Sequence, residues 1–133
     1  MSMKAIAPFY LCNQLLAPVA KTATFTSTAQ DFANVIENEI VIFPGLWTDG
    51  THTFTINDSP DSTTWTSVTS TYLVFTNSNT AINAITSTAS AVVQRFSYIG
   101  PQRYLQLIST IAASTTGAIY GRFTNLRYRK LPV

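Results

Sequence analysis

Cysteine and histidine are nearly absent from this chain of 133 residues, which contains one of each, Cys12 and His52. A single cysteine excludes an intrachain disulfide, and therefore a fold that disulfides hold together. A zinc site usually takes three or four His or Cys ligands, which is more than these two residues can supply. We expect Cys12 to be a buried or half-buried apolar residue, and His52 to be packed or hydrogen-bonded beside a turn.

Motifs of the common enzyme classes are also missing. None of the five glycines forms a glycine-rich phosphate loop or the G-x-S-x-G turn that presents a nucleophilic serine. Asp49, Asp58 and Asp61 lie among turn-forming residues, where aspartate normally accepts hydrogen bonds from the nearby backbone. Asp58 and Asp61 could supply oxygen ligands to calcium, but their spacing matches no calcium-loop motif. The sequence therefore predicts no catalytic residue, no metal ligand and no cofactor.

Charged residues make up only 11% of the chain, less than half of the usual fraction of about 25%. All six acidic residues lie in the first half, ending at Asp61, and every charged residue after it is basic. This asymmetry indicates either two faces of opposite sign that pair with other molecules, or chance placement on a solvated surface. The basic residues are too sparse for a nucleic-acid interface, and no apolar run is long enough to span a membrane.

Serine and threonine, by contrast, make up about a quarter of the chain, and β-branched threonine favours strands. The clearest strand is residues 51–57, where apolar and polar side chains alternate with a period of two. A continuous apolar run at 40–43 indicates a strand buried on both faces, which Pro44 and Gly45 are expected to end. Further strands are expected at 22–27, 72–75, 92–99, 104–111 and 118–126.

About eight strands joined by short turns, with almost no helix, predict an all-β domain. Strands in this number bury their apolar faces as two packed antiparallel sheets or as a closed barrel. Their spacing leaves the jelly roll, the immunoglobulin-like sandwich and the barrel open. Residues 77–90 are small and polar and indicate a long loop, and residues 128–133 form a basic tail. Residues 1–20, interrupted by prolines, are expected to form an extended N-terminal arm before a domain that covers 21–133.

Four short motifs follow one another between residues 45 and 132. Residues 45–54 read Gly-Leu-Trp-Thr-Asp-Gly-Thr-His-Thr-Phe, and a turn rich in serine and aspartate that leads to Thr-Thr-Trp follows at 58–65. Tyr-Ile-Gly at 98–100 is followed after a two-residue gap by Arg-Tyr, and Thr-Gly-Ala at 116–118 precedes a basic end that contains proline. In their order over residues 22–133 these motifs resemble the capsid decoration (cement) proteins of tailed bacteriophages.

The resemblance implies a jelly-roll sandwich that has no active site and that assembles as a homotrimer. Such a protein would lie on the outer surface of the capsid and bind across neighbouring major capsid proteins, without contacting nucleic acid or a membrane. Many modest contacts that are repeated by symmetry would then stabilise the shell through avidity.

Candidate contacts with the capsid or between subunits come from the arm, from one turn and from the basic tail. The arm is too apolar to be left in water, and Trp47 is expected to be an exposed aromatic side chain. The candidates are Phe9, Tyr10, Leu11, Leu15, Leu16, Trp47, Arg127, Arg129 and Lys130. Two alternatives remain open. One is a carbohydrate-binding sandwich or phage adhesin that binds a glycan through aromatic side chains, and the other is a tail or head-completion protein.

Overall fold

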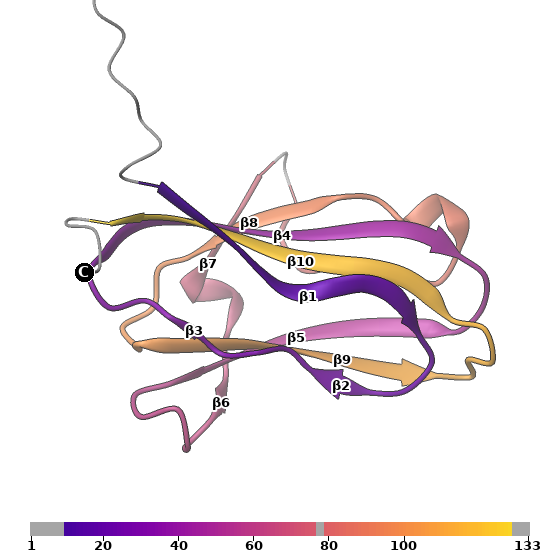
Figure 1. The fold of residues 1–133 in the computed structure, drawn as a ribbon, viewed down its shortest axis with the longest axis horizontal. Helices are drawn as coiled ribbons and strands as arrows, with labels where there is room; N and C mark the ends of the chain where they lie inside the picture. The colour runs from indigo at the N-terminus through magenta and orange to yellow at the C-terminus, as the bar shows by residue number, and fades with distance from the viewer. Residues whose placement is uncertain (1–9, 77–78, 129–133) are drawn as a thin grey trace, which may run out of the picture.

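The computed structural model describes residues 10–76 and 79–128. They form two five-stranded antiparallel sheets that pack face to face as a sandwich (Figure 1), which confirms the all-β prediction. The helical elements in these ranges are the 3-10 turns η2 (Ser70–Tyr72) and η3 (Thr88–Ser90), and no helix there has the length and hydrophobicity to cross a membrane. The strands are β1 (Tyr10–Lys21), β2 (Phe25–Thr26), β3 (Gln30–Asp31), β4 (Val35–Trp47), β5 (Thr51–Ser59), β6 (Thr66–Ser67), β7 (Leu73–Phe75), β8 (Gln94–Tyr98), β9 (Tyr104–Ala112) and β10 (Ala118–Tyr128).

The strand order identifies the sandwich as a jelly roll. One sheet has the order β1-β10-β4-β8-β7, and the other has the order β2-β9-β5-β6, with β3 also paired to β9. Along the chain the pairs are nested: β1 with β10, β2 and β3 with β9, β4 with β8, and β5 with β6. A long antiparallel hairpin folded over on itself in this way is the jelly-roll arrangement. Strand pairing thus decides between the folds that the spacing leaves open.

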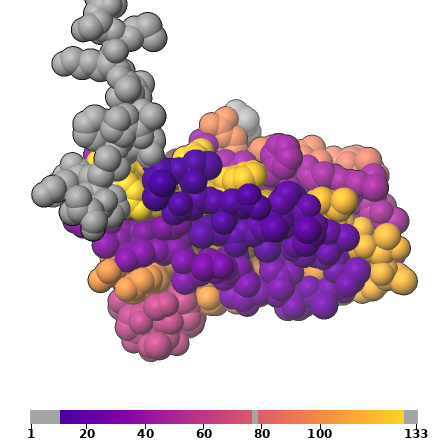
Figure 2. Space-filling view, in the orientation of Figure 1, coloured from indigo at the N-terminus to yellow at the C-terminus, as the bar shows by residue number. Residues whose placement is uncertain are grey.

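Residues 10–20 are not an arm outside the domain, which corrects the boundary expected at residue 21. They form most of β1, an extended edge strand that pairs with β10 along its length and lies across the face of the molecule seen in Figure 2. Pro18 is tolerated because one side of an edge strand needs no hydrogen bonds. The apolar character of the segment is explained in part by Leu16, which packs against the core. Residues 1–9 lie outside the described residues.

β4 is longer than the sequence indicates, because it continues through Pro44 and Gly45 to Trp47. Its pairing with β8 covers only Ile40–Ile42, so at Pro44 its paired neighbour is β10 alone. Proline is accepted in a strand where one side is free of ladder hydrogen bonds. The expected end of this strand at Pro44 is therefore wrong.

The core lies between the sheets and follows the alternation of the strands. Along β5 the inward positions His52, Phe54 and Ile56 are buried, as the sequence predicts. The other sheet residues of the core cluster are Ile40, Ile42, Phe96, Tyr98, Leu105, Leu107, Ala118 and Tyr120. The segment between β7 and β8 also contributes, since Ile85 is fully buried and exchanges two backbone hydrogen bonds of 2.9 Å with His52. The loop expected at 77–90 is therefore anchored in the core.

Candidate contact surfaces

Some of the predicted contact residues lie outside the described residues: Phe9, Arg129 and Lys130. Tyr10 and Arg127 lie together, because they are register partners at the start of β1 and near the end of β10. The Nη1 atom of Arg127 lies 3.1 Å from Oε1 of Glu37 on β4. Arg127 is therefore part of an ion pair on the surface of the first sheet.

The three leucines of the expected arm differ in burial. Leu16 packs against the core, Leu15 is half-buried, and Leu11 is exposed. Cys12, next to Leu11, is also exposed, which corrects the expectation that it is buried or half-buried. The beginning of β1 is therefore open to another molecule, and so is its end, where Val19 is 55% exposed.

Trp47 is half-buried, which corrects the prediction of an exposed aromatic side chain. Its ring packs against the core, and its indole N–H donates a 3.0 Å hydrogen bond to the carbonyl oxygen of Gly50. Gly50 has a φ of 88°, in the left-handed region that glycine adopts without strain. The glycan-binding alternative therefore has no freely exposed ring at this position.

His52 is buried and hydrogen-bonded, as the sequence predicts. Its Nδ1 lies 3.2 Å from the Tyr120 hydroxyl, and its Nε2 lies 3.1 Å from the carbonyl oxygen of Asp49. The Tyr120 hydroxyl is also 2.6 Å from Oγ of Ser109, and burial raises the pKa of Tyr120 to about 12. This network lies between the sheets, where satisfied polar groups stabilise one arrangement of the core.

Asp49 fastens one loop to another. Its carboxylate accepts hydrogen bonds from the backbone N–H groups of Thr115, Thr116 and Gly117, the shortest being 2.6 Å from Gly117. The bonds from Gly117 and Thr116 are the main reason that the pKa of Asp49 is lowered. The sequence predicts that this turn aspartate bonds nearby backbone, but Gly117 lies 68 residues further along the chain.

Asp61 and Asp58 have separate roles. Asp61 accepts bonds of 2.9 and 2.7 Å from the backbone N–H groups of Thr63 and Thr64, as expected for a turn, and these bonds lower its pKa. Asp58 lies in β5 rather than in a turn, is buried, and accepts a 2.6 Å hydrogen bond from the Tyr98 hydroxyl. Within residues 10–76 and 79–128, no group of three or more His, Cys, Asp or Glu residues is placed to hold a metal ion.

Exposed apolar side chains gather at one end of the sheet that contains β1, and we call this region the apolar end. Here β1 and β4 finish while β10 and β8 begin (Figure 1). The register aligns Val19 of β1 with Tyr120 of β10 and with Pro44 of β4. The apolar end consists of the exposed residues Val19, Phe43, Leu46, Val92 and Val93, together with the half-buried Phe123.

Two phenylalanines form the aromatic part of the apolar end. Phe43 is 48% exposed and meets Phe123 edge to face, with ring centroids 6.3 Å apart. Gly121 lies opposite Phe43 on β10, so no side chain covers the ring from that position. Val92 and Val93, both exposed, directly precede the first residue of β8. A partner that covered this end would bury aromatic and aliphatic surface together.

The other half of the same sheet carries ion pairs, and we call it the charged end. It adjoins the apolar end, because Arg95 lies in register with Val41, whose partner on β10 is Phe123. Glu39 of β4 lies 2.6 Å from Arg95 of β8, and it also accepts a 3.2 Å hydrogen bond from the Asn125 amide of β10. The pair of Glu37 with Arg127 lies two residues away along β4 and β10. The side chains in these pairs are between 30% and 61% exposed, so each pair contributes little to stability.

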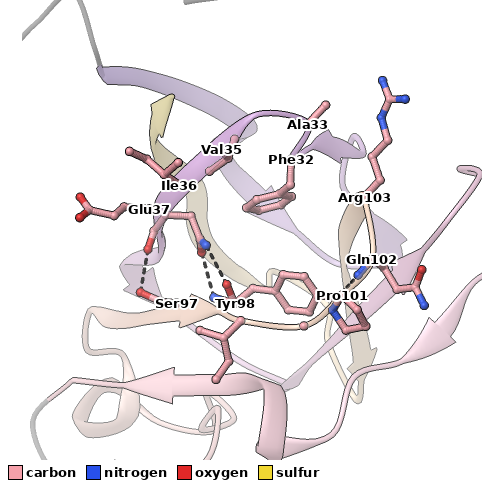
Figure 3. A pocket seen from close by; sticks show the side chains of 13 residues that line it. Phe32, Ala33, Val35, Ile36, Glu37, Ser97, Tyr98, Pro101, Gln102 and Arg103 are labelled. Carbon is pink, nitrogen blue, oxygen red and sulfur yellow. Dashed lines mark hydrogen bonds between the residues drawn. The ribbon is translucent and has the colours of Figure 1, made fainter. Parts of the chain in front are cut away.

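A pocket with a volume of about 710 Å³ borders the charged end (Figure 3). Tyr98 is held there by Asn38, whose amide accepts a 2.8 Å hydrogen bond from the Tyr98 N–H and donates one of 2.7 Å to the Tyr98 carbonyl. Phe32 packs on Tyr98 with a centroid distance of 5.8 Å. Ile36 and Ile99 line the pocket and are exposed.

A second pocket, of about 470 Å³, lies at the charged end between β1, β4 and β10. Its lining includes Leu11 and Cys12 from β1 together with Asn125 from β10. Both pockets therefore combine apolar and polar groups.

No protein-family model, no curated protein and no solved structure matches this chain. The jelly-roll assignment follows from strand order, and a fold by itself does not imply a function. The two ends of the sheet are therefore the observations from which a function can be proposed.

The apolar end is not among the contact residues that the sequence indicates. In β10 the inward residues include Arg122 and Thr124, whereas Phe123 between them is directed outward. Hydrophobicity therefore indicates the wrong face at these three positions. The inward position of Arg122 can be predicted from its spacing instead. Tyr120 and Leu126 lie an even number of residues from Arg122, so they share its face of the strand, and both are buried.

Proposed function

We propose that this chain is a structural virion protein that decorates the outer surface of a tailed-phage capsid. In this proposal it binds across neighbouring major capsid proteins as a homotrimer. The apolar end carries the proposal, because exposed apolar side chains such as Phe43 and Leu46 are what interaction sites on soluble proteins present. The motif order over residues 22–133 supports it independently.

The apolar end suits contacts between copies of the chain. Interfaces of permanent homo-oligomers are more apolar than the rest of the surface, and large aromatic side chains often dominate their binding energy. Phe43 and Phe123 supply the aromatic pair, and Leu46, which is 65% exposed, extends the same region. A closed trimer would remove these side chains from water.

The charged end suits contact with the shell. Ion pairs and polar groups at the margin of an interface set its orientation and speed association more than they add affinity. Glu39–Arg95 and Glu37–Arg127 lie beside two pockets that could accept a protruding loop of a capsid protein. Arg129 directly follows β10 in the sequence and remains a predicted contact.

Light scattering on the purified chain tests the self-association. A trimer is expected, and Phe43→Ser should shift it towards the monomer because the substitution removes exposed apolar area from the apolar end. Val74→Ser is the matched control, since Val74 is 51% exposed but lies on β7, outside the apolar end. A monomer at every concentration would contradict the proposed trimer.

Binding to phage heads prepared without the protein tests the attachment. The unaltered chain should bind in many copies per head, and Arg95→Glu should weaken binding more strongly at low salt than at high salt. Lys21→Glu makes the same change of charge at the opposite end of the sheet and should leave binding unchanged. If the unaltered chain does not bind such heads, the proposed function is wrong.

A further inference from the structure

Arg122 is fully buried in the middle of the sandwich. It occupies an inward position of β10, with Tyr120 and Thr124 on the same face, and its register partners on the adjacent strands are Leu16 and Ile42. Burial lowers the pKa of Arg122 to about 10, so the side chain still carries its proton at neutral pH. A buried charge costs free energy unless it is paired and hydrogen-bonded.

Only one of the three guanidinium nitrogens has a partner within the described residues. Nη1 of Arg122 donates a 2.7 Å hydrogen bond to Oγ of Ser27. That hydroxyl also accepts a 3.0 Å bond from the Leu107 N–H and donates one of 3.2 Å to the Thr28 carbonyl, so its capacity is filled. Among the described atoms, Nε and Nη2 of Arg122 have no hydrogen-bond partner, and neither does the buried hydroxyl of Thr124.

Two other arginines of this protein use the same pair of nitrogens to hold an anionic group. Nε and Nη2 of Arg103 donate to the two carboxylate oxygens of Asp31 at 3.0 and 2.8 Å. In Arg95 both nitrogens donate to a single atom, Oε2 of Glu39, at 3.2 and 2.6 Å. These N–H groups lie on one edge of the planar guanidinium and form a fork that suits anions. Arg122 presents this fork inside the core.

No carboxylate side chain of the protein is free to occupy that fork. All six acidic residues fall within the described residues. Three form ion pairs with exposed arginines, and two accept hydrogen bonds from the backbone of turns. The sixth, Asp58, accepts its hydrogen bond from Tyr98. The charge of Arg122 therefore has no partner of opposite sign among the side chains of its own chain.

We propose that the fork of Arg122 binds a small monatomic anion of the halide class between the two sheets. A water molecule could accept the two hydrogen bonds, but only an anion also balances the charge. The contact of Arg95 with one oxygen of Glu39 shows that a single acceptor atom fits between Nε and Nη2. Thr124 lies two residues along the same face, and its buried hydroxyl also has no partner among the described atoms. This site is independent of the proposed capsid function.

Urea unfolding of the full chain in sodium chloride and in sodium gluconate, at equal ionic strength and protein concentration, tests the site. Gluconate is too large to enter a packed core, so it matches chloride only in screening. Because an ion that binds only the folded chain stabilises it, the folding equilibrium constant should rise roughly tenfold for each tenfold rise in chloride above the dissociation constant. Equal stability in the two salts at every concentration would overturn the proposal.

Arg122→Met separates this site from general effects of salt, because it removes the fork and fills a similar volume. It should lose the difference between chloride and gluconate, whereas Arg95→Met, which removes an exposed guanidinium, should keep it. A difference that persists in Arg122→Met would overturn the proposal.

Crystals of the unaltered protein grown in bromide provide a measurement that does not depend on folding of the variant. Anomalous scattering should place bromide beside Nε and Nη2 of Arg122. An ordered water at this position, or no peak, would show that the buried charge is accommodated without an anion and would overturn the proposal.

Discussion

The two ends of the sheet that contains β1 present opposite chemistry on one continuous scaffold. β4 runs through both: it places Glu37 and Glu39 in ion pairs near its start, and it leaves Phe43 and Leu46 exposed near its end. The backbone pairing with β10 continues from one end to the other, so side chains make the difference. One strand therefore carries two surfaces of different chemistry, which the proposed bridging of capsid proteins would use.

The apolar end rests on the core beneath it, and Ile85→Ala should produce the largest loss of stability among single changes near it. Ile85 is fully buried and bridges the backbone of His52. Truncating a buried isoleucine to alanine costs about 2–5 kcal/mol, because apolar contacts are lost and a cavity remains. Urea unfolding measures the loss. Val74→Ala, at an exposed valine of β7 outside the apolar end, is the control and should change little; a similar loss in both would contradict the assignment of Ile85 to the core.

A buried hydrogen bond of Tyr98 stabilises the core beneath the charged end. Tyr98→Phe should therefore lower the free energy of unfolding, by less than Ile85→Ala does. The Tyr98 hydroxyl donates a 2.6 Å hydrogen bond to the buried Asp58 and accepts one of 3.1 Å from the Gln102 N–H. Its removal leaves a buried acceptor unsatisfied, at a cost of about 1–3 kcal/mol. Tyr104→Phe, at a half-buried residue of β9 in the other sheet, is the matched control in the same unfolding experiment. Equal stability of Tyr98→Phe and the unaltered chain would show that water replaces this bond.

Acid should weaken the apolar end through Asp49. Backbone hydrogen bonds lower the pKa of Asp49 in the folded state below its ordinary value of 3.8, so its stabilising effect is fully present above that value and is lost as the pH falls through the folded pKa. Asp49→Asn lacks this titration. The difference in urea midpoint between the unaltered chain and Asp49→Asn should therefore shrink in acid; a difference that stays constant from neutral to acidic pH would contradict this role.

The smallest effect is expected from the ion pairs of the charged end. Glu39→Gln removes the charge opposite Arg95 but keeps an acceptor for Asn125. Partly exposed pairs contribute about 0–1 kcal/mol, and salt screens them. Unfolding at low and at high salt should show a small loss that disappears at high salt. A loss as large as that of Tyr98→Phe would mean that the charged end supports the fold as well as its surface.

Local pattern was sufficient to predict an all-β fold and part of its core. Residues 51–57 alternate apolar and polar side chains, and this pattern correctly predicts which face of β5 is buried. His52 shares the parity of Phe54, so its burial follows from the same pattern. These predictions hold because the alternation of a strand depends only on neighbouring residues.

Predictions failed where a residue's role depends on a strand far away in the sequence. An apolar segment at 10–20 suits both a loose arm and an edge strand, and only pairing with β10 separates the two. Pro44 would interrupt a strand paired on both sides, but β8 does not extend to it. Trp47 lies beside a turn and was expected to be exposed, but contact with the core buries part of its side chain.

The sequence alone determined that this protein is all-β, that its strands alternate, and that its carboxylates are few, because composition and period-two patterning are local properties. Tertiary structure decided the nesting of the strand pairs, the separation of an apolar end from a charged end, and the enclosure of Arg122 without a carboxylate partner. Each of these depends on which distant strands become neighbours. That choice is made by the burial of whole faces in the assembled sandwich, and local preference does not contain it.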